Sequence, residues 1–252
     1  MGDCGEASNC GAGAMGARMK SVEEMNRLNY ELRVAAESGE LARIEKALRD
    51  GADAKHNNSE ALRTSVMRGR TACVEALLIG GADPRARESW CLEFASGMGP
   101  LDVFNMLLLP GSEAMARESA ALRAAARSGR PDKVAALLAG SNVKARSSEA
   151  LRLAAGRGSV GCVRLLLPLS DPLAKDADAL KSAVAGGHEA VVAELLGWGT
   201  DYSRICGLLI MERSAQERGL FEMAYALRAS REQSDLKRMF GSKGVERGGK
   251  RL

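Results

Sequence analysis

The sequence has few aromatic residues, only two histidines and no long apolar run. Aromatic residues make up 4% of the 252 residues, so the core must consist mainly of Ala, Leu and Val, which suit closely packed short helices. No apolar stretch approaches the roughly 18 residues that a membrane-spanning helix needs. His56 and His188 stand in no catalytic or metal-ligand spacing. We therefore predict no catalytic residue, metal, cofactor, membrane span or small-molecule substrate.

The cysteines show no metal-binding or redox spacing. None of the six forms a C-x-x-C pair, and no secretory signal sequence is recognisable. Two of them, Cys73 and Cys162, occupy the same place in a repeated pattern, where Val103 and Val191 stand in other copies. We interpret them as small core residues of an intracellular protein in a reducing compartment, with the cytoplasm favoured.

The net charge of +4 is concentrated near the end of the chain. Residues 231–252 contain three acidic residues and seven basic ones, so residues 1–230 sum to zero. The basic residues are Arg231, Lys237, Arg238, Lys243, Arg247, Lys250 and Arg251. This segment has no helical periodicity, and we predict that 231–252 is a basic tail. Residues 1–20 are rich in Gly and Ala, which predicts a flexible arm.

One pattern recurs six times between about residues 29 and 203. Its first marker, which we call the spine leucine, recurs every 29 or 30 residues as Leu32, Leu62, Leu92, Leu122, Leu151 and Leu180. Seven residues after each spine leucine stands Gly39, Gly69, Gly99, Gly129, Gly158 or Gly187. Five residues later come Ile44, Val74, Phe104, Val134, Val163 and Val192, and four beyond those come Leu48, Leu78, Leu108, Leu138, Leu167 and Leu196.

These markers predict a helix–turn–helix unit. Three residues before five of the spine leucines stand the predicted N-caps Asn29, Ser59, Ser89, Ser119 and Ser148. The glycine ends the first helix with a positive φ, and a turn such as Gly51-Ala-Asp53 ends the second. The apolar face of the second helix must pack on the next unit, so such units are stable only as a stack. The pattern predicts an all-α solenoid over residues 21–230.

The two ends of the predicted solenoid depart from the pattern. Ser21 and Glu24 have the spacing of a capping box, which predicts a short helix ahead of the first repeat. The last unit, residues 204–230, is irregular and is interpreted as a divergent cap. It contains a longer predicted helix over 205–218, a stop at Gly219 and a closing helix over 220–229.

The repeats resemble ankyrin repeats. The carrying residues are Gly187-His188-Glu-Ala-Val191-Val192-Ala-Glu-Leu195-Leu196, the recurrent Gly-Ala-Asp turns, and paired alanines such as Ala35-Ala36 and Ala154-Ala155. The family's Thr-Pro-Leu-His opening is absent, and each unit is three to four residues shorter than the usual 33, which predicts trimmed hairpin loops. This short form is similar to repeats common in large DNA viruses. The resemblance implies a domain that binds proteins through its helix ends, loops and concave face and has no chemistry of its own.

Basic residues recur at two places in the repeat. One follows the spine leucine as Arg33, Arg63, Arg123, Arg152 and Lys181, with Glu93 as the exception, and the other follows the turn as Arg87, Arg117, Arg146 and Lys175. We call these two rows the basic ladder. The ladder either binds an acidic or phosphate-bearing partner or pairs with carboxylates of neighbouring repeats. The neutrality of residues 1–230 favours pairing.

Two functions remain open from the sequence. The first is a non-enzymatic adaptor that binds a protein partner, acidic if the ladder is used, with Trp198 as a second contact. The alternative is a structural subunit of a large protein or ribonucleoprotein assembly. Its anchor would be the tail residues Lys237, Arg238, Lys243, Arg247, Lys250 and Arg251, which could also follow an RNA backbone.

Overall fold

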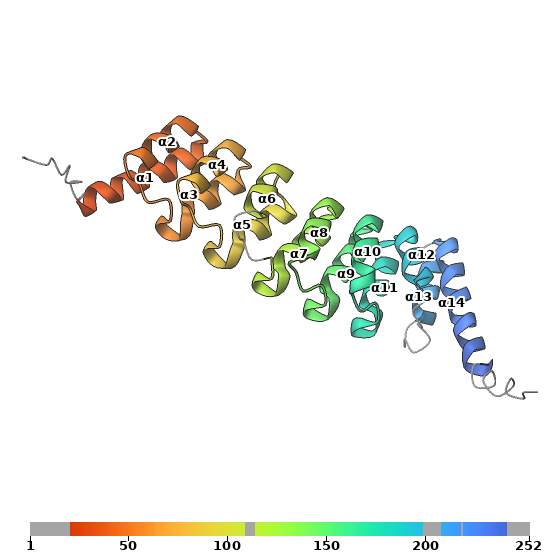
Figure 1. Ribbon diagram of the computed structural model, residues 1–252. Helices are drawn as coiled ribbons and strands as arrows, with labels where there is room; N and C mark the ends of the chain where they lie inside the picture. The colour runs from red at the N-terminus through yellow and green to blue at the C-terminus, as the bar shows by residue number, and fades with distance from the viewer. Residues whose placement is uncertain (1–20, 109–113, 199–207, 218, 241–252) are drawn as a thin grey trace, which may run out of the picture.

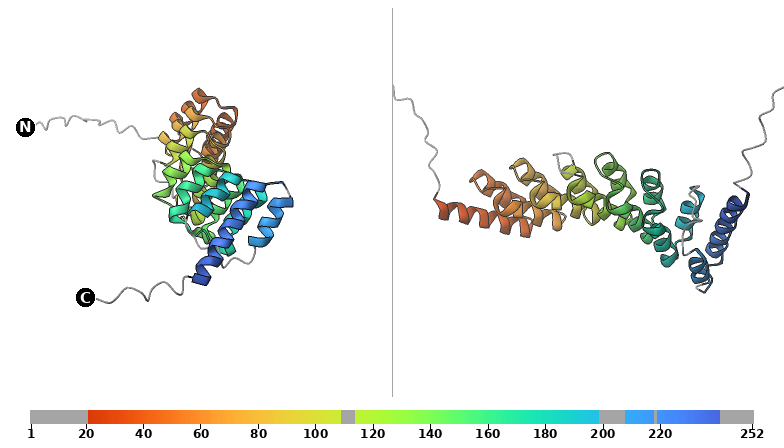
Figure 2. Two further views of the ribbon diagram at one scale, coloured as in Figure 1. Left: turned by 90° about the vertical axis from the view of Figure 1, so that its right-hand side faces the viewer. Right: turned by 90° about the horizontal axis from the view of Figure 1, so that it is seen from below.

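The computed structural model describes residues 21–108, 114–198, 208–217 and 219–240. Every regular element within these residues is a helix, and the helices stack in two rows, with α1 and α14 at opposite ends of the stack (Figure 1). The right-hand view of Figure 2 shows the same elongated arrangement from below, and the left-hand view looks along the stack. The predicted all-α solenoid is confirmed.

Each repeat contributes one helix to each row. The first-helix row consists of α1 (Val22–Ser38), α3 (His56–Met67), α5 (Ala86–Gly97), α7 (Ala116–Ser128), α9 (Ala145–Arg157), α11 (Ala174–Gly186) and α13 (Leu208–Glu217). The second-helix row consists of α2 (Leu41–Arg49), α4 (Thr71–Ile79), α6 (Leu101–Leu108), α8 (Pro131–Leu138), α10 (Val160–Leu166), α12 (Glu189–Gly197) and α14 (Phe221–Phe240). A 3₁₀ turn, Leu167–Leu169, follows α10. Neighbouring first helices pack on one another from α1 to α13.

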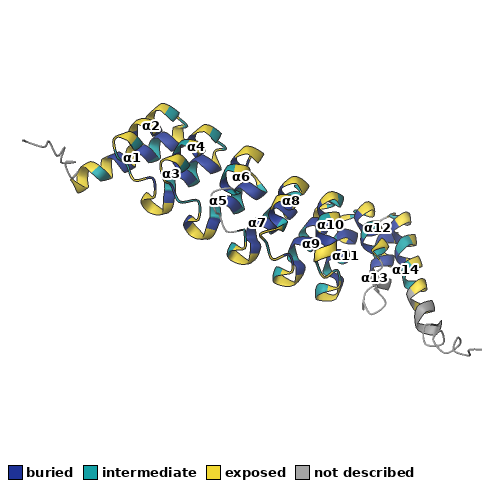
Figure 3. Ribbon diagram, viewed as in Figure 1, coloured by how far each residue is buried: buried dark blue, intermediate teal, exposed yellow. Residues whose placement is uncertain are grey.

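The core runs along the line where the two rows meet (Figure 3). All six spine leucines are at most 2% exposed, and the predicted apolar residues from Ile44 to Val192 are fully buried. The later leucine marker packs against the edge of this core, and five of its six members are half-buried. The preceding residue is buried instead, as Ala47, Leu77, Leu107, Leu137, Leu166 and Leu195. Both positions lie on the apolar face, but the earlier one points between the rows.

Five of the six predicted glycine stops have the expected positive φ. Gly39, Gly69, Gly129, Gly158 and Gly187 have φ values between 65° and 80°. The N–H of the residue after each glycine bonds back to the first helix, as Arg130 does to the carbonyl of Ala125 at 3.1 Å. This is the bond that a left-handed glycine makes possible at a helix end. Gly99 is the exception, because its φ lies outside the left-handed region.

The end of α5 is completed by a lysine from the next repeat. Pro100 follows Gly99 and has no N–H to donate to the carbonyl of Ala95. The Nζ of Lys133, on α8, donates instead to the carbonyls of Ala95 at 2.5 Å and Gly99 at 2.7 Å. Lys133 is fully buried, and its Nζ lies 5.4 Å from the centre of the Phe104 ring. Burial, with a smaller contribution from nearby positive charge, lowers the pKa of this amine to about 8.

The predicted N-caps have a different role from the one expected. The first helices from α3 to α11 each begin with a turn of three positive-φ residues, and the predicted cap or its equivalent Ala177 is the third. Ser59 Oγ accepts a hydrogen bond from the N–H of Asp83, and Ser119 Oγ accepts one from Asn142, both at 2.8 Å. These donors lie in the turn that ends the second helix of the same repeat and leads into the next first helix. The side chains therefore fix the turn between successive repeats instead of capping their own helices.

In the first repeat, Asn29 accepts the equivalent hydrogen bond, although α1 has no turn of positive-φ residues. Ser21 caps α1 by accepting from the N–H of Glu24 at 3.1 Å. The helix predicted to begin at Ser21 is therefore present, but it is not short, because it continues without a break into the first helix of the first repeat. Asn29 is buried inside α1, where its Oδ1 accepts from the N–H of Asp53 at 2.7 Å.

The last unit consists of α13 and α14, separated by Gly219 with φ of 73°. The second of these helices continues to Phe240, so the predicted loss of helix at residue 231 is wrong. The buried carboxylate of Glu212 holds it in place by pairing with Arg228 at 2.8 Å and Arg231 at 3.3 Å. Lys237 and Arg238 belong to α14, whereas Lys243, Arg247, Lys250, Arg251 and the predicted arm 1–20 lie outside the described residues.

Candidate functional site

The basic ladder lies along the first-helix row. Its first row occupies the half-buried position after the spine leucine, and its second row begins the positive-φ turns from α5 to α11. Residues at equivalent positions of stacked repeats lie next to one another, so both rows share one side of the solenoid. We call this side, with its turns, the first-helix face.

Most of the ladder residues are paired with carboxylates. Arg123 and Arg146 both reach Glu149, at 3.5 Å and 3.6 Å, and Arg146 also reaches Glu118 at 2.7 Å. The same Glu149 pairs with Arg152 at 3.0 Å. These contacts link α7 and α9 through charges that neutralise one another, which is the arrangement favoured by the neutrality of residues 1–230.

Similar pairs extend the network in both directions. Arg152 continues to Asp178 at 3.3 Å, and Arg117 contacts Glu93 at 2.9 Å. Lys181 lies 2.6 Å from Asp176, and Arg33 lies 3.7 Å from Glu37. Exposed pairs of this kind contribute about 0–1 kcal/mol each. Their clearest effect is to reduce the positive potential of the ladder, so its role in binding stays a prediction.

Three ladder residues have no ion pair with a described residue. Arg87 and Lys175 are exposed on their turns. Arg63 is half-buried on α3, where one guanidinium nitrogen donates to the carbonyl of Asn57 at 3.3 Å and Nε has no partner. The equivalent arginines Arg123 and Arg152 each pair with the residue two places before the next spine leucine. Next to Arg63 that place belongs to Trp90.

An aromatic groove lies where the ion pairs are interrupted. Trp90 and Phe94 stack on α5 with ring centroids 5.3 Å apart. Together with Met98, which directly follows α5, and Ala124 on α7, they line a groove of about 190 Å³, which we call the α5–α7 groove. Met98 is 74% exposed. Other repeats have small or polar residues at the position of Phe94, apart from Val34 and Leu153.

Three arginines at the carboxyl ends of first helices remain free of ion pairs. They are Arg68 after α3, Arg127 in the last turn of α7 and Arg157 in the last turn of α9, and all three are exposed. No carboxylate among the described residues lies within ion-pair distance of them. We call them the carboxyl-end arginines. The repeat pattern does not single them out, because they do not stand at one fixed spacing from the spine leucine.

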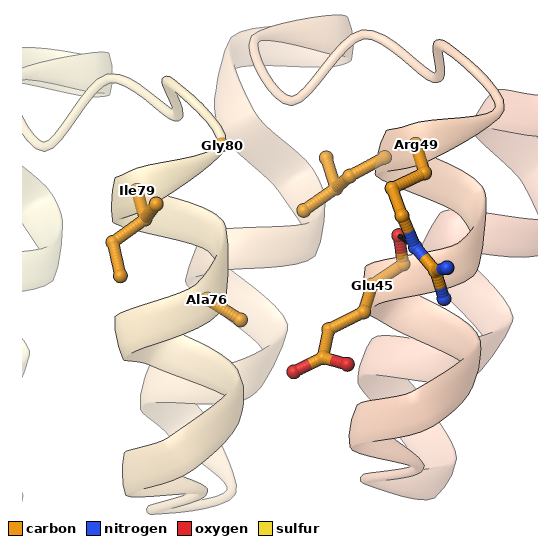
Figure 4. Close-up of a pocket in the computed structure, with 6 residues that line it drawn as sticks. Glu45, Arg49, Ala76, Ile79 and Gly80 are labelled. Carbon is orange, nitrogen blue, oxygen red and sulfur yellow. Dashed lines mark hydrogen bonds between the residues drawn. The ribbon is translucent and has the colours of Figure 1, made fainter.

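Two other surface features lie away from this region. Trp198 is 49% exposed at the end of α12, as predicted. An open groove of about 430 Å³ separates α2 from α4 on the second-helix side, with Ala76 on one wall and Glu45 and Arg49 on the other (Figure 4). Ile79 at its rim is 82% exposed.

The described residues offer no arrangement for catalysis or metal binding. They contain no group of three or more His, Cys, Asp or Glu side chains that could hold a metal. Burial raises the pKa of the Cys91 thiol to about 12 and raises that of Cys73 and Cys162, so these thiols are poor nucleophiles. The Nε2 of His188 lies 3.0 Å from the carbonyl of Gly156 in the preceding repeat. No helix within the described parts of the chain is long and apolar enough to span a membrane.

Comparisons with known proteins identify the repeats. Residues 122–205 match a family model described as ankyrin repeats in three copies. The crystal structure of an ankyrin repeat domain from Acinetobacter baumannii matches with 26% identity and a TM-score of 0.55. That match covers 67% of this chain and 97% of the bacterial domain. No curated protein matches the chain in sequence.

The matches agree with the repeat pattern and with the two rows of helices. Residues 122–205 carry ankyrin repeats, and the fold is an all-α ankyrin solenoid. Such repeats are generally protein–protein interaction modules and are typically non-enzymatic. The family model covers about a third of the chain, and the spine leucines extend the same unit back to Leu32.

Proposed function

We propose that this ankyrin solenoid is a non-enzymatic adaptor that binds a protein partner on its first-helix face. The observation that carries the proposal is the α5–α7 groove. It places Trp90 and Phe94 on the surface of a chain that has only nine aromatic residues. Aromatic side chains in a shallow depression are typical anchors of protein interfaces.

The size of the groove favours a protein over a small molecule. Small-molecule pockets usually measure about 300–1,000 Å³ and enclose most of their ligand. The α5–α7 groove measures about 190 Å³, which is room for one large side chain. A side chain inserted from a partner protein would bury the edges of Trp90 and Phe94 and the exposed part of Met98. The predicted contacts Arg87 and Lys175 extend the proposed surface along the stack, whereas Trp198 lies at the end of α12 in the second-helix row.

Site-specific photo-crosslinking tests this function. We would replace Phe94 by p-benzoylphenylalanine, which preserves an aromatic ring in the groove, and irradiate cells of the source organism. The matched control carries the same amino acid at Ile79, on the opposite, second-helix side. We expect a discrete protein adduct from position 94 that is absent from position 79. Adducts from position 79 alone would contradict the proposal.

The alternative, anchoring through the basic tail, rests on the concentration of the net charge in residues 231–252. Because Arg231 pairs with the buried Glu212, truncation at residue 230 would also damage the solenoid. A better test changes Lys243, Arg247, Lys250 and Arg251 to Gln in the full chain. If the protein is a tail-anchored subunit, this variant no longer co-purifies with a large ribonuclease-sensitive particle. The adduct from position 94 is then lost as well. If it is an adaptor, the adduct remains.

A further inference from the structure

The chemistry of the partner can be inferred from the charges around the α5–α7 groove. Along α7 and α9 the ladder arginines are paired, and little of their charge remains for a partner. The pairing is interrupted at Arg63 on α3, because Trp90 of α5 stands where a carboxylate would meet it. Interruption of the network therefore exposes an apolar groove and leaves one guanidinium without a carboxylate at the same place.

The carboxyl-end arginines add positive charge along the same face. Arg127 lines the α5–α7 groove itself, while Arg68 and Arg157 end the first helices on either side of α5 and α7. The carboxyl end of a helix carries a partial negative charge, which favours a cation there but is too weak to neutralise it. A ligand along this face would meet three exposed guanidinium groups that have no ion pair in the described structure.

A peptide matches the groove better than RNA does. Glu93 also lines the groove, where its carboxylate pairs with Arg117 at 2.9 Å and makes that arginine unavailable to the phosphates of a nucleic-acid backbone. A peptide can place a neutral side chain beside Glu93 and carboxylates beside the arginines. Trp90 and Phe94 stack on each other, so one face of each ring is already covered and is closed to a nucleobase.

We propose that the α5–α7 groove and the carboxyl-end arginines bind an acidic peptide segment that inserts one aromatic or long aliphatic side chain. The inserted side chain lies against Trp90, Phe94 and Met98. Carboxylates on either side of it meet Arg127 and the two neighbouring arginines, with Arg63 available to a residue near Trp90. This inference rests on the proposed protein-binding function and names the class of partner for it.

A peptide selection tests the partner class with the full-length protein. A display library of random 12-residue peptides would be selected against the immobilised chain. We expect enriched peptides that carry Asp or Glu around a single Trp, Phe, Leu or Met. Enrichment of basic or neutral peptides would overturn the inference, and so would tighter binding of a 10-nucleotide single-stranded RNA than of the selected peptides.

Variants then locate the bound peptide. Arg127→Glu reverses one charge at the groove, and Ala124→Met fills the groove from a half-buried position of α7 without removing any contact. We expect each to weaken binding at least tenfold, while the exposed second-helix control Lys46→Glu changes it less than twofold. Acidic peptides that bind all three variants equally would overturn the inference and leave the crosslinking test of the proposed function unaffected.

Tryptophan emission gives a readout that does not depend on affinity. The chain has two tryptophans, so Trp198→Phe leaves Trp90 as the single reporter. A side chain inserted in the groove removes water from Trp90, and we expect its emission to shift to shorter wavelength with the same midpoint as binding. An unchanged spectrum at saturation would place the peptide elsewhere and overturn the inference.

Discussion

The carbonyl at the end of α5 and the equivalent carbonyls of the other first helices accept their hydrogen bonds from different kinds of donor. After α1, α3, α7, α9 and α11 a left-handed glycine lets the next backbone N–H return to the helix. After α5 that residue is Pro100, and the missing donor comes from Lys133, 33 residues along the chain. We call the end of a first helix, together with the hydrogen bond that completes it, a joint. A regular joint is complete within its own repeat, whereas the irregular joint after α5 requires the following repeat to be folded.

At the end of α5, the buried ammonium group of Lys133 replaces the backbone N–H that Pro100 lacks. Cys73, Val103, Cys162 and Val191 fill the position of Lys133 in other repeats, and all are buried without making a polar contact to the preceding repeat. Burying an ammonium costs free energy, because water is lost. Here two carbonyl oxygens and the Phe104 ring face the amine and offset part of that cost.

The largest expected effect is that of Lys133→Met, which keeps the aliphatic volume and removes the donors. Two buried carbonyls then lose their partner at about 1–3 kcal/mol each, partly offset because no charge has to be buried. We expect the free energy of unfolding to fall by about 2 kcal/mol or more. Urea unfolding followed by circular dichroism measures it, with the exposed Lys46→Met as control. A loss equal to that of the control would show that the joint does not need the amine.

The second-largest expected effect is a pH dependence of stability that comes from Lys133 and therefore from the irregular joint alone. The folded-state pKa of Lys133 is lowered from 10.5 to about 8, so between these values the unfolded chain holds more protons than the folded one. Stability from this group therefore rises with pH over that window and is flat below it. At about 1.4 kcal/mol per pKa unit, the wild type should gain about 1–3 kcal/mol relative to Lys133→Met. Urea titrations at pH 7.5 and 9.5 test this, and parallel curves for the two proteins would refute it.

Converting the irregular joint to the regular one should rescue the loss. Pro100→Arg restores a backbone N–H, and arginine already occupies this position as Arg70 and Arg130. In the Lys133→Met background we expect a gain of about 1–2 kcal/mol, and in the wild type little change. The double-mutant cycle gives the coupling energy between the two sites. Equal effects in both backgrounds would mean that Pro100 and Lys133 act independently.

The smallest expected effect concerns a regular joint. Gly129 has φ of 68°, where a Cβ is unfavourable. Gly129→Ala should cost about 1 kcal/mol, and Gly129→Asn less, because asparagine tolerates left-handed backbone. Thermal unfolding of the two variants measures the difference. If alanine were no worse than asparagine, the left-handed glycine would not be what completes this joint.

The regular joints could be predicted from the sequence and the irregular one could not. Spine leucines and glycines recur, so their burial and backbone conformation follow from the repeat. The irregular joint depends on two departures 33 residues apart, and neither is informative alone. A signal was nevertheless present, because after the exposed Arg43 of the first repeat the column of Lys133 holds only small apolar residues otherwise, and Pro100 stands in a column of N–H donors.

The candidate site shows a second limit of sequence reasoning. Arg123 and Arg152 were correctly placed on one face, but a sequence does not show which carboxylate reaches each of them. The serines illustrate the same point, since a hydroxyl such as that of Ser119 identifies an acceptor and not its donor. In the same way, the sequence does not show that Arg231 on α14 reaches Glu212 on α13.

The bond from each turn to the serine or asparagine that opens the same repeat also determines how such a protein can change in length. Acceptor and donor are 24 residues apart for Asn29 and Ser59 but 23 apart for Ser119 and Ser148. The missing residue lies in the turn, because Leu48 precedes its Asp53 by five positions and Leu138 precedes Asn142 by four. Units of either length make this bond within themselves. Gene duplication or recombination can therefore insert, delete or exchange whole units of 29 or 30 residues without disturbing the copies on either side.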